Sequence, residues 1–117
     1  MNLRIFTALI CFYSFTLLAQ ADSVYLGADE IQTIVDKLGV KLLLNNDQKN
    51  DIYQTLTTYS TELNSLRVQG NFSEDGRQEL VNSTNTKILL TFDDKQKIKY
   101  GILEKELWVS IKTEEND

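Results

Sequence analysis

The chain has 117 residues, with 17 acidic and 12 basic side chains, one cysteine, one methionine and no histidine or proline. The cysteine is Cys11, so the sequence after residue 21 lacks both Cys and His, which excludes disulfides, thiolate nucleophiles, imidazole bases and the usual zinc sites. All 17 acidic residues but only 11 basic ones follow residue 21, and their net charge of −6 repels phosphate backbones. We therefore expect no nucleic acid partner.

The first 21 residues have the organisation of a secretory signal peptide. Arg4 precedes an apolar run over residues 5–18, and Ala19-Gln20-Ala21 has the pattern of a small-x-small cleavage site. The apolar run, of about 14 residues, is shorter than the roughly 20 that a membrane-spanning helix needs. We predict that residues 1–21 are removed and that residues 22–117 form one domain, without a membrane span, in the periplasm or outside the cell.

Two amphipathic helices are predicted in the first half of that domain. The first covers Asp29 to Leu43, and the second begins after Asn45 and ends near Gly70, a residue that tolerates the positive φ found after helices. Apolar residues at helical spacing mark the inner faces of these helices: Ile31, Ile34, Val35, Leu38 and Leu42 in the first, and Ile52, Leu56, Tyr59, Leu63 and Leu66 in the second.

Two more helices are predicted in the second half, which makes the expected fold an all-α, antiparallel four-helix bundle of elongated or cradle-like shape. Ser73 is the expected N-cap of the third helix, and the fourth starts near Asp94. The acidic tail from Thr113 is expected to fray. The third helix has its predicted inner face at Leu80, Val81, Thr84 and Ile88.

The fourth predicted helix is apolar on two nearly opposite sides. One stripe consists of Ile98, Ile102 and Val109. The other consists of Tyr100, Leu103, Leu107 and Ile111, and Trp108 falls between the two stripes. A single-chain core uses one stripe easily, so either the helix lies between neighbours or one stripe faces a partner. We take the second stripe and Trp108 as the candidate protein-binding or dimer face.

Lys95, Lys97, Lys99 and Lys105 form a basic patch on the same predicted helix, which we interpret as a solvated face.

Three segments place a glutamine three residues after an Asp or Asn: Asp29–Gln32, Asn45–Gln48 and Asp93–Gln96. This spacing is that of a capping box. The Asx side chain accepts a hydrogen bond from the backbone of the third helical residue, and the glutamine reaches back to the N-cap backbone. All three segments are therefore predicted to start helices.

Two of these boxes share more than capping requires. Leu44 and Phe92 each precede the Asx residue, and Gln48 and Gln96 are each followed by lysine. The pair resembles the two L-T-x-x-Q motifs of the Spy/CpxP family, small bacterial periplasmic proteins with a signal peptide and four helices in the same order. The sequence departs from that pattern at three positions, with Asn45 and Asp93 in place of threonine and Phe92 in place of leucine.

The resemblance, over roughly residues 40–112, implies a thin, curved, antiparallel helical homodimer. Such a protein holds unfolded proteins without ATP, or modulates an envelope-stress sensor. Metal-binding relatives use His and Met, which residues 22–117 lack, so we expect no metal and no cofactor. The residues themselves also fit a secreted effector, inhibitor or structural subunit that recognises one protein partner. Catalysis is not expected, because only Asp, Glu, Lys, Tyr and Arg are available as titratable side chains.

Overall fold

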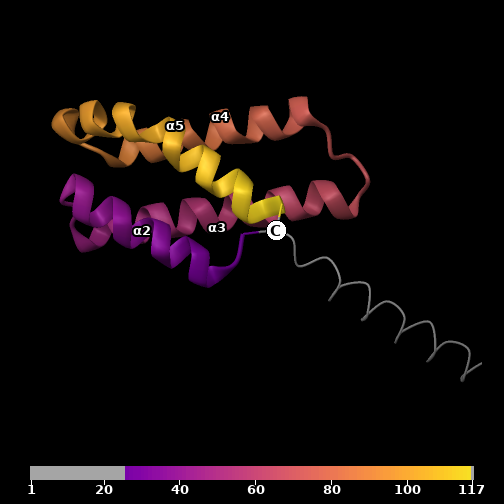
Figure 1. The fold of residues 1–117 in the computed structure, drawn as a ribbon, viewed down its shortest axis with the longest axis horizontal. Helices are drawn as coiled ribbons and strands as arrows, with labels where there is room; N and C mark the ends of the chain where they lie inside the picture. The colour runs from indigo at the N-terminus through magenta and orange to yellow at the C-terminus, as the bar shows by residue number, and fades with distance from the viewer. Residues whose placement is uncertain (1–25, 117) are drawn as a thin grey trace, which may run out of the picture.

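A computed structural model describes residues 26–116 and contains four helices and no strand within them (Figure 1). The predicted all-α fold is confirmed, and the predicted helices lie close to the observed ones. The predicted signal peptide lies outside the described residues. In the labels of Figure 1, the helices are α2 (Ala28–Leu42), α3 (Asn46–Val68), α4 (Glu74–Thr91) and α5 (Asp94–Asn116). None of the described helices is long and apolar enough to span a membrane.

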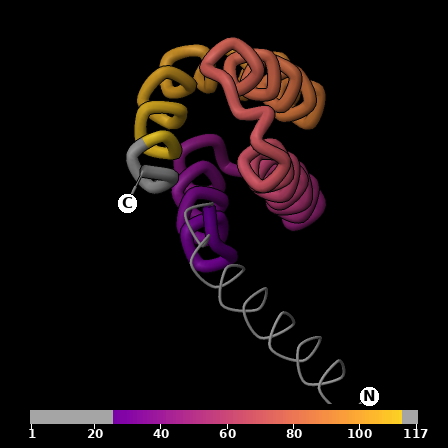
Figure 2. The backbone as a smooth tube through the Cα atoms, turned by 90° about the vertical axis from the view of Figure 1, so that its right-hand side faces the viewer, coloured from indigo at the N-terminus to yellow at the C-terminus, as the bar shows by residue number. Residues whose placement is uncertain are grey.

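The helices form two consecutive antiparallel hairpins, α2–α3 and α4–α5. Helix α3 packs against both α2 and α4, and α5 packs against α2. Figure 1 shows α5 running obliquely from the end of α4 towards α2, and Figure 2 shows the four helices arranged around a common interior. The α2–α3 and α4–α5 turns lie at the same end of the bundle, and the α3–α4 loop lies at the other.

The interior is filled by the predicted inner faces of the helices. Leu66 and Leu80 are only partly buried, whereas the other predicted core residues of α2, α3 and α4 are buried. Burial of large aliphatic and aromatic side chains is the main stabilising contribution to such a fold, at roughly 1.5–3 kcal/mol each. The largest fully buried side chains on α3 and α5 are Ile52, Leu56, Tyr59, Leu63, Tyr100 and Ile111.

Two helices end in a left-handed residue, but only one of these residues is a glycine. After α3, Gly70 has φ +73°, and the backbone amides of Gly70 and Asn71 bond the carbonyls of Arg67 and Leu66 at 3.2 and 3.0 Å. This is the Schellman arrangement, as expected for Gly70. After α2, Leu43 takes the same role with φ 55°, although it is 78% exposed and gains little from packing.

The structure corrects the first of the three predicted capping boxes. The N-cap of α2 is Gly27, which makes no side-chain cap, and Gln32 donates instead to the Asp36 carboxylate at 2.9 Å. Because α2 begins at Ala28, Asp29 lies inside the first turn, where a carboxylate interacts favourably with the helix dipole. At the other end of the domain, the α5 backbone stays helical to Asn116, beyond the start of the predicted frayed tail.

Candidate functional site

The other two predicted capping boxes are present, at the starts of α3 and α5. The backbone amide of Gln48 donates to Oδ1 of Asn45 at 2.8 Å, and the backbone amide of Asn45 donates to Oε1 of Gln48 at 3.0 Å. Asp93 and Gln96 repeat this geometry, at 2.8 and 3.0 Å. Each box therefore satisfies backbone donors at a helix start that would otherwise lack partners.

The glutamines of the two boxes are also bonded to each other. Nε2 of Gln48 donates to Oε1 of Gln96 at 2.7 Å and to the Thr91 carbonyl at 3.1 Å. Nε2 of Gln96 donates to Oε1 of Gln48 at 3.3 Å and to the Leu42 carbonyl at 3.2 Å. We call this pair the glutamine clasp. Through the clasp, the start of α3 is bonded to the end of α4, and the start of α5 is bonded to the end of α2.

The apolar residues that precede the two boxes anchor the clasp from the core side. Leu44 and Phe92 are both buried, and the Phe92 ring lies against Tyr100 with centroids 5.1 Å apart and a tilt of 58°. Gln96 itself is buried. All six motif residues identified in the sequence thus lie at one end of the bundle, where they hold the two turns together.

A second polar cluster joins α4 to α5. Oδ1 of Asn85 accepts from the Tyr100 hydroxyl at 2.6 Å and from Nε1 of Trp108 at 3.0 Å, and its Nδ2 donates to Glu104 at 3.0 Å. Burial raises the pKa of the Tyr100 phenol well above its ordinary value, so the phenol stays protonated and can donate. Trp108 also makes an edge-on contact with Tyr59, with centroids 5.3 Å apart.

Sequence reasoning missed Asn85, although a signal was available. Asn85 follows Thr84 on the inner side of α4, where an amide needs partners, and Tyr100 and Trp108 are the aromatic residues of α5 with polar atoms. Tyr100 is buried and Asn85 and Trp108 are partly buried, which favours pairing of their polar groups. Asn85 is 15 and 23 positions from Tyr100 and Trp108, and the sequence alone did not indicate that these side chains would meet.

The predicted binding face on α5 is part of the core. Tyr100, Leu107 and Ile111 are buried, and Leu103 and Trp108 are packed against the core cluster. This stripe is therefore not available as a free surface on the single chain, because α5 turns it towards the other helices. The opposite stripe is the exposed one: Ile98, Ile102 and Val109 are 71%, 78% and 61% exposed. We call these three residues the outer stripe.

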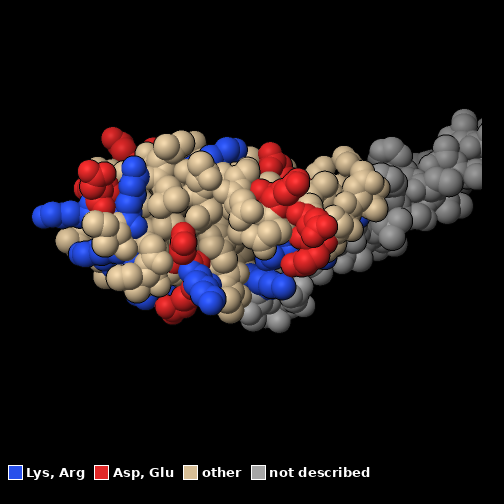
Figure 3. Space-filling model, turned by 90° about the horizontal axis from the view of Figure 1, so that it is seen from above, with Lys and Arg blue, Asp and Glu red and all other residues tan. Residues whose placement is uncertain are grey.

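Charged side chains surround the outer stripe on α5 and the start of α4. Lys95, Lys97, Lys99 and Lys105 are exposed, as predicted for a solvated face, and Lys112 reaches Glu74 of α4 at 3.6 Å. Figure 3 looks onto α4 and α5 from above. Uncharged atoms occupy the middle of this face, and acidic side chains gather near its right-hand end, beside the grey atoms.

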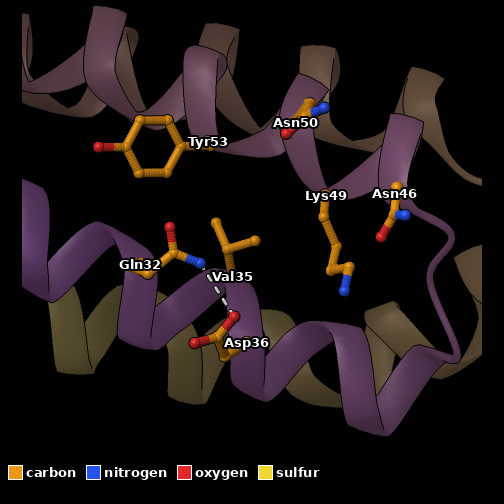
Figure 4. A pocket seen from close by; sticks show the side chains of 7 residues that line it. All are labelled: Gln32, Val35, Asp36, Asn46, Lys49, Asn50 and Tyr53. Atoms are coloured by element: carbon orange, nitrogen blue, oxygen red, sulfur yellow. Dashed lines mark hydrogen bonds between the residues drawn. The ribbon is translucent and has the colours of Figure 1, made fainter.

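A polar hollow of about 480 Å³ lies between α2 and α3. Figure 4 shows Tyr53, Asn50, Lys49 and Asn46 along α3, opposite Gln32, Val35 and Asp36 on α2. Of these seven residues only Val35 is buried, so the hollow is an open groove rather than an enclosure of the kind that covers most of a small ligand. Within the described residues, no group of three or more His, Cys, Asp or Glu side chains could hold a metal ion.

Comparisons with protein-family models, with curated protein sequences and with solved structures found no match for this chain.

Proposed function

We propose that this protein binds other proteins outside the cytoplasm, as a Spy/CpxP-like chaperone without ATP or as a modulator of an envelope-stress sensor. The observation that carries the proposal is the outer stripe of α5. Ile98 and Ile102 are exposed for most of their area, one turn apart, and Val109 continues the line two turns later. Exposed apolar side chains that line up in this way are typical of a protein interaction surface.

The glutamine clasp supports the comparison with the Spy/CpxP family. The resemblance depends on two copies of one short motif, and here the glutamines of both copies bond each other and the opposite hairpin. A single capping box would not need a second copy, whereas a clasp needs both. The paired motif is therefore accounted for by one structural role, which is to hold the two hairpins together at one end.

The shape of the outer stripe also favours a second candidate function, recognition of one defined partner. The stripe lies on one face of a single helix and is only a few turns long. A surface of this shape fits one apolar helix or groove on a native protein. A secreted effector, inhibitor or structural subunit would use it to bind that protein tightly and would ignore unfolded chains.

Suppression of client aggregation tests the first proposal. Residues 22–117 are added in increasing ratio to a chemically denatured protein as it is diluted into buffer, and light scattering is followed. We expect suppression that the Ile98→Ser/Ile102→Ser variant loses. Val40→Ser/Val68→Ser is the matched control, because both of these valines are exposed on other helices. No suppression at several-fold excess would favour the single-partner function, and equal loss in both variants would contradict the assignment to α5.

A further inference from the structure

We propose that a hollow between α4 and α5 binds an N-acetylated sugar chain. The hollow has a volume of about 440 Å³, within the range of roughly 300–1,000 Å³ that is typical of small-ligand sites. Its lining residues lie on α4 up to Asn85 and on α5 from Glu104, away from the turn that joins these helices. It shares only Val109 with the outer stripe, so the inference goes beyond the proposed function and does not depend on it.

Trp108 gives the hollow an aromatic surface whose position is fixed by its neighbours. The indole is partly buried, its Nε1 donates to Oδ1 of Asn85 at 3.0 Å, and its ring makes the edge-on contact with Tyr59. The C–H groups of a sugar ring pack well against an aromatic ring. Because the indole is already held in place, little conformational entropy is lost when a ligand packs against it.

Oriented polar groups line the hollow beside the indole. Nδ2 of Asn85 donates to the Glu104 carboxylate at 3.0 Å, which fixes one of its oxygens. Arg77 also lines the hollow and is only 6% exposed. A carboxylate accepts hydrogen bonds and a guanidinium donates them. The hydroxyls of a sugar, which both donate and accept, therefore have partners of both kinds at this site.

Two amides on the rim from α4 match an acetamido group. Gln78 and Asn82 are exposed, and Nε2 of Gln78 donates to Oδ1 of Asn82 at 3.0 Å. Among the described contacts, this bond leaves Oε1 of Gln78 as an acceptor and Nδ2 of Asn82 as a donor. An acetamido group offers the complementary N–H and C=O. Val81 and Val109 also line the hollow and provide apolar surface for its methyl group.

The charges around the hollow favour a neutral ligand over a phosphate. Three basic side chains, Arg77, Lys105 and Lys112, and two acidic ones, Glu74 and Glu104, line it. Arg77 and Lys112 lie 3.9 and 3.6 Å from Glu74, so this carboxylate compensates their charge. Lys105 is exposed to solvent. With these charges balanced inside the site, hydrogen bonds and packing determine which ligand fits.

The fluorescence of Trp108 tests the site directly, because Trp108 is the single tryptophan of the chain. Residues 22–117 are titrated with chitotriose, the trimer of N-acetylglucosamine, and with cellotriose, a glucose trimer of the same linkage without acetamido groups. We expect a saturable change with chitotriose and a Kd about tenfold higher for cellotriose, which lacks the two hydrogen bonds to the rim amides. Inorganic phosphate, the third ligand, should cause no saturable change.

Variants that keep Trp108 locate the bound sugar. We expect Asn82→Ala and Glu104→Gln each to raise the Kd for chitotriose about fivefold, because each weakens one hydrogen bond to the ligand. Trp108→Ala is not used, because Trp108 also packs against Tyr59. Asn50→Ala is the matched control and should leave the Kd unchanged, because Asn50 is an exposed amide of the hollow between α2 and α3.

Three outcomes would overturn the proposal: no saturable change with chitotriose, equal affinities for the two trimers, or a greater loss of affinity in Asn50→Ala than in Asn82→Ala. These results are separable from a failure of the proposed function. Ile98→Ser/Ile102→Ser should bind chitotriose as tightly as the unmodified protein. Sugar binding without aggregation suppression would contradict the chaperone alone, and suppression without sugar binding would contradict this site alone.

Discussion

The two faces of α5 carry similar apolar residues in opposite surroundings. Tyr100 and Ile111 on the inner face are fully buried, while Ile98 and Ile102 on the outer face are mostly exposed. The inner face also holds the Tyr100 hydroxyl and the Trp108 Nε1, both bonded to Asn85 of α4. Apolar spacing reveals both stripes of such a helix. Spacing alone does not indicate which stripe enters the core, whereas the hydrogen bonds of Tyr100 and Trp108 to Asn85 fit the buried position of the inner stripe.

The largest expected difference between the two faces is the cost of truncating a side chain. Ile111→Ala removes a fully buried side chain and leaves a cavity, so we expect the free energy of unfolding to fall by about 3–4 kcal/mol. Ile102→Ala should change it by less than about 0.5 kcal/mol. Urea unfolding followed by circular dichroism measures both values. Similar costs at the two positions would show that the outer stripe is also buried.

The position of the inner face depends on the turn that the glutamine clasp holds. Gln96→Ala removes bonds to the Asp93 amide, the Leu42 carbonyl and Gln48, so we expect a loss of about 2 kcal/mol in the free energy of unfolding. Gln32→Ala is the control and should cost less than about 0.5 kcal/mol, because Gln32 is exposed and bonds only Asp36 among the described contacts.

The clasp also predicts that its two members are not independent. In combination, Gln48→Ala and Gln96→Ala should cost about 1 kcal/mol less than the sum of the single changes, because they share hydrogen bonds. Additive costs would mean that each glutamine acts only as a cap for its own helix.

High pH should act on the inner face of α5 through the Tyr100 phenol. The Tyr100 phenol has a raised pKa in the folded protein, so it stays protonated while the unfolded chain loses the proton above about pH 10. The neutral phenol therefore stabilises the fold fully below that pH and progressively less above it. Between pH 9 and pH 11, the unmodified protein should lose about 1.4 kcal/mol more than Tyr100→Phe. An unchanged pH profile in the variant would place the phenol in solvent.

The smallest expected effects concern the C-terminal ends of α2 and α3. Leu43→Gly should stabilise the protein by about 0.5–1 kcal/mol, because φ is positive there and the leucine is exposed. Gly70→Ala should destabilise it by about 1 kcal/mol for the opposite reason. Thermal unfolding compares the two. Changes of the same sign would contradict the left-handed assignment of one of the two residues.

Much of this fold was predictable because its local signals agree with one another. Ser73 caps α4, Gly70 lies just after the C-cap of α3, and two of the three capping boxes start helices. The failure at Asp29–Gln32 has a local cause. The same spacing also occurs inside a first turn, where Asp29 interacts with the helix dipole and Gln32 bonds Asp36 instead.

The candidate site was less predictable because it depends on contacts between distant residues. The six motif residues were identified, but not the clasp between Gln48 and Gln96, which are 48 positions apart. The sequence did not indicate which of the two stripes of α5 is buried in the single chain, because both have helical spacing. Asn85 bonds the polar atoms of the inner face, and its role becomes apparent only once α4 and α5 are placed side by side.

A thiol-reactivity measurement compares the two faces of α5 during binding most directly. Residues 22–117 contain no cysteine, so Ile102→Cys and Leu107→Cys each introduce a single probe. At low protein concentration, we expect the probe at residue 102 to react quickly and to become protected when a denatured client is added. The probe at residue 107 should react slowly throughout. Protection at 107 without protection at 102 would contradict the account and return the binding face to the inner stripe.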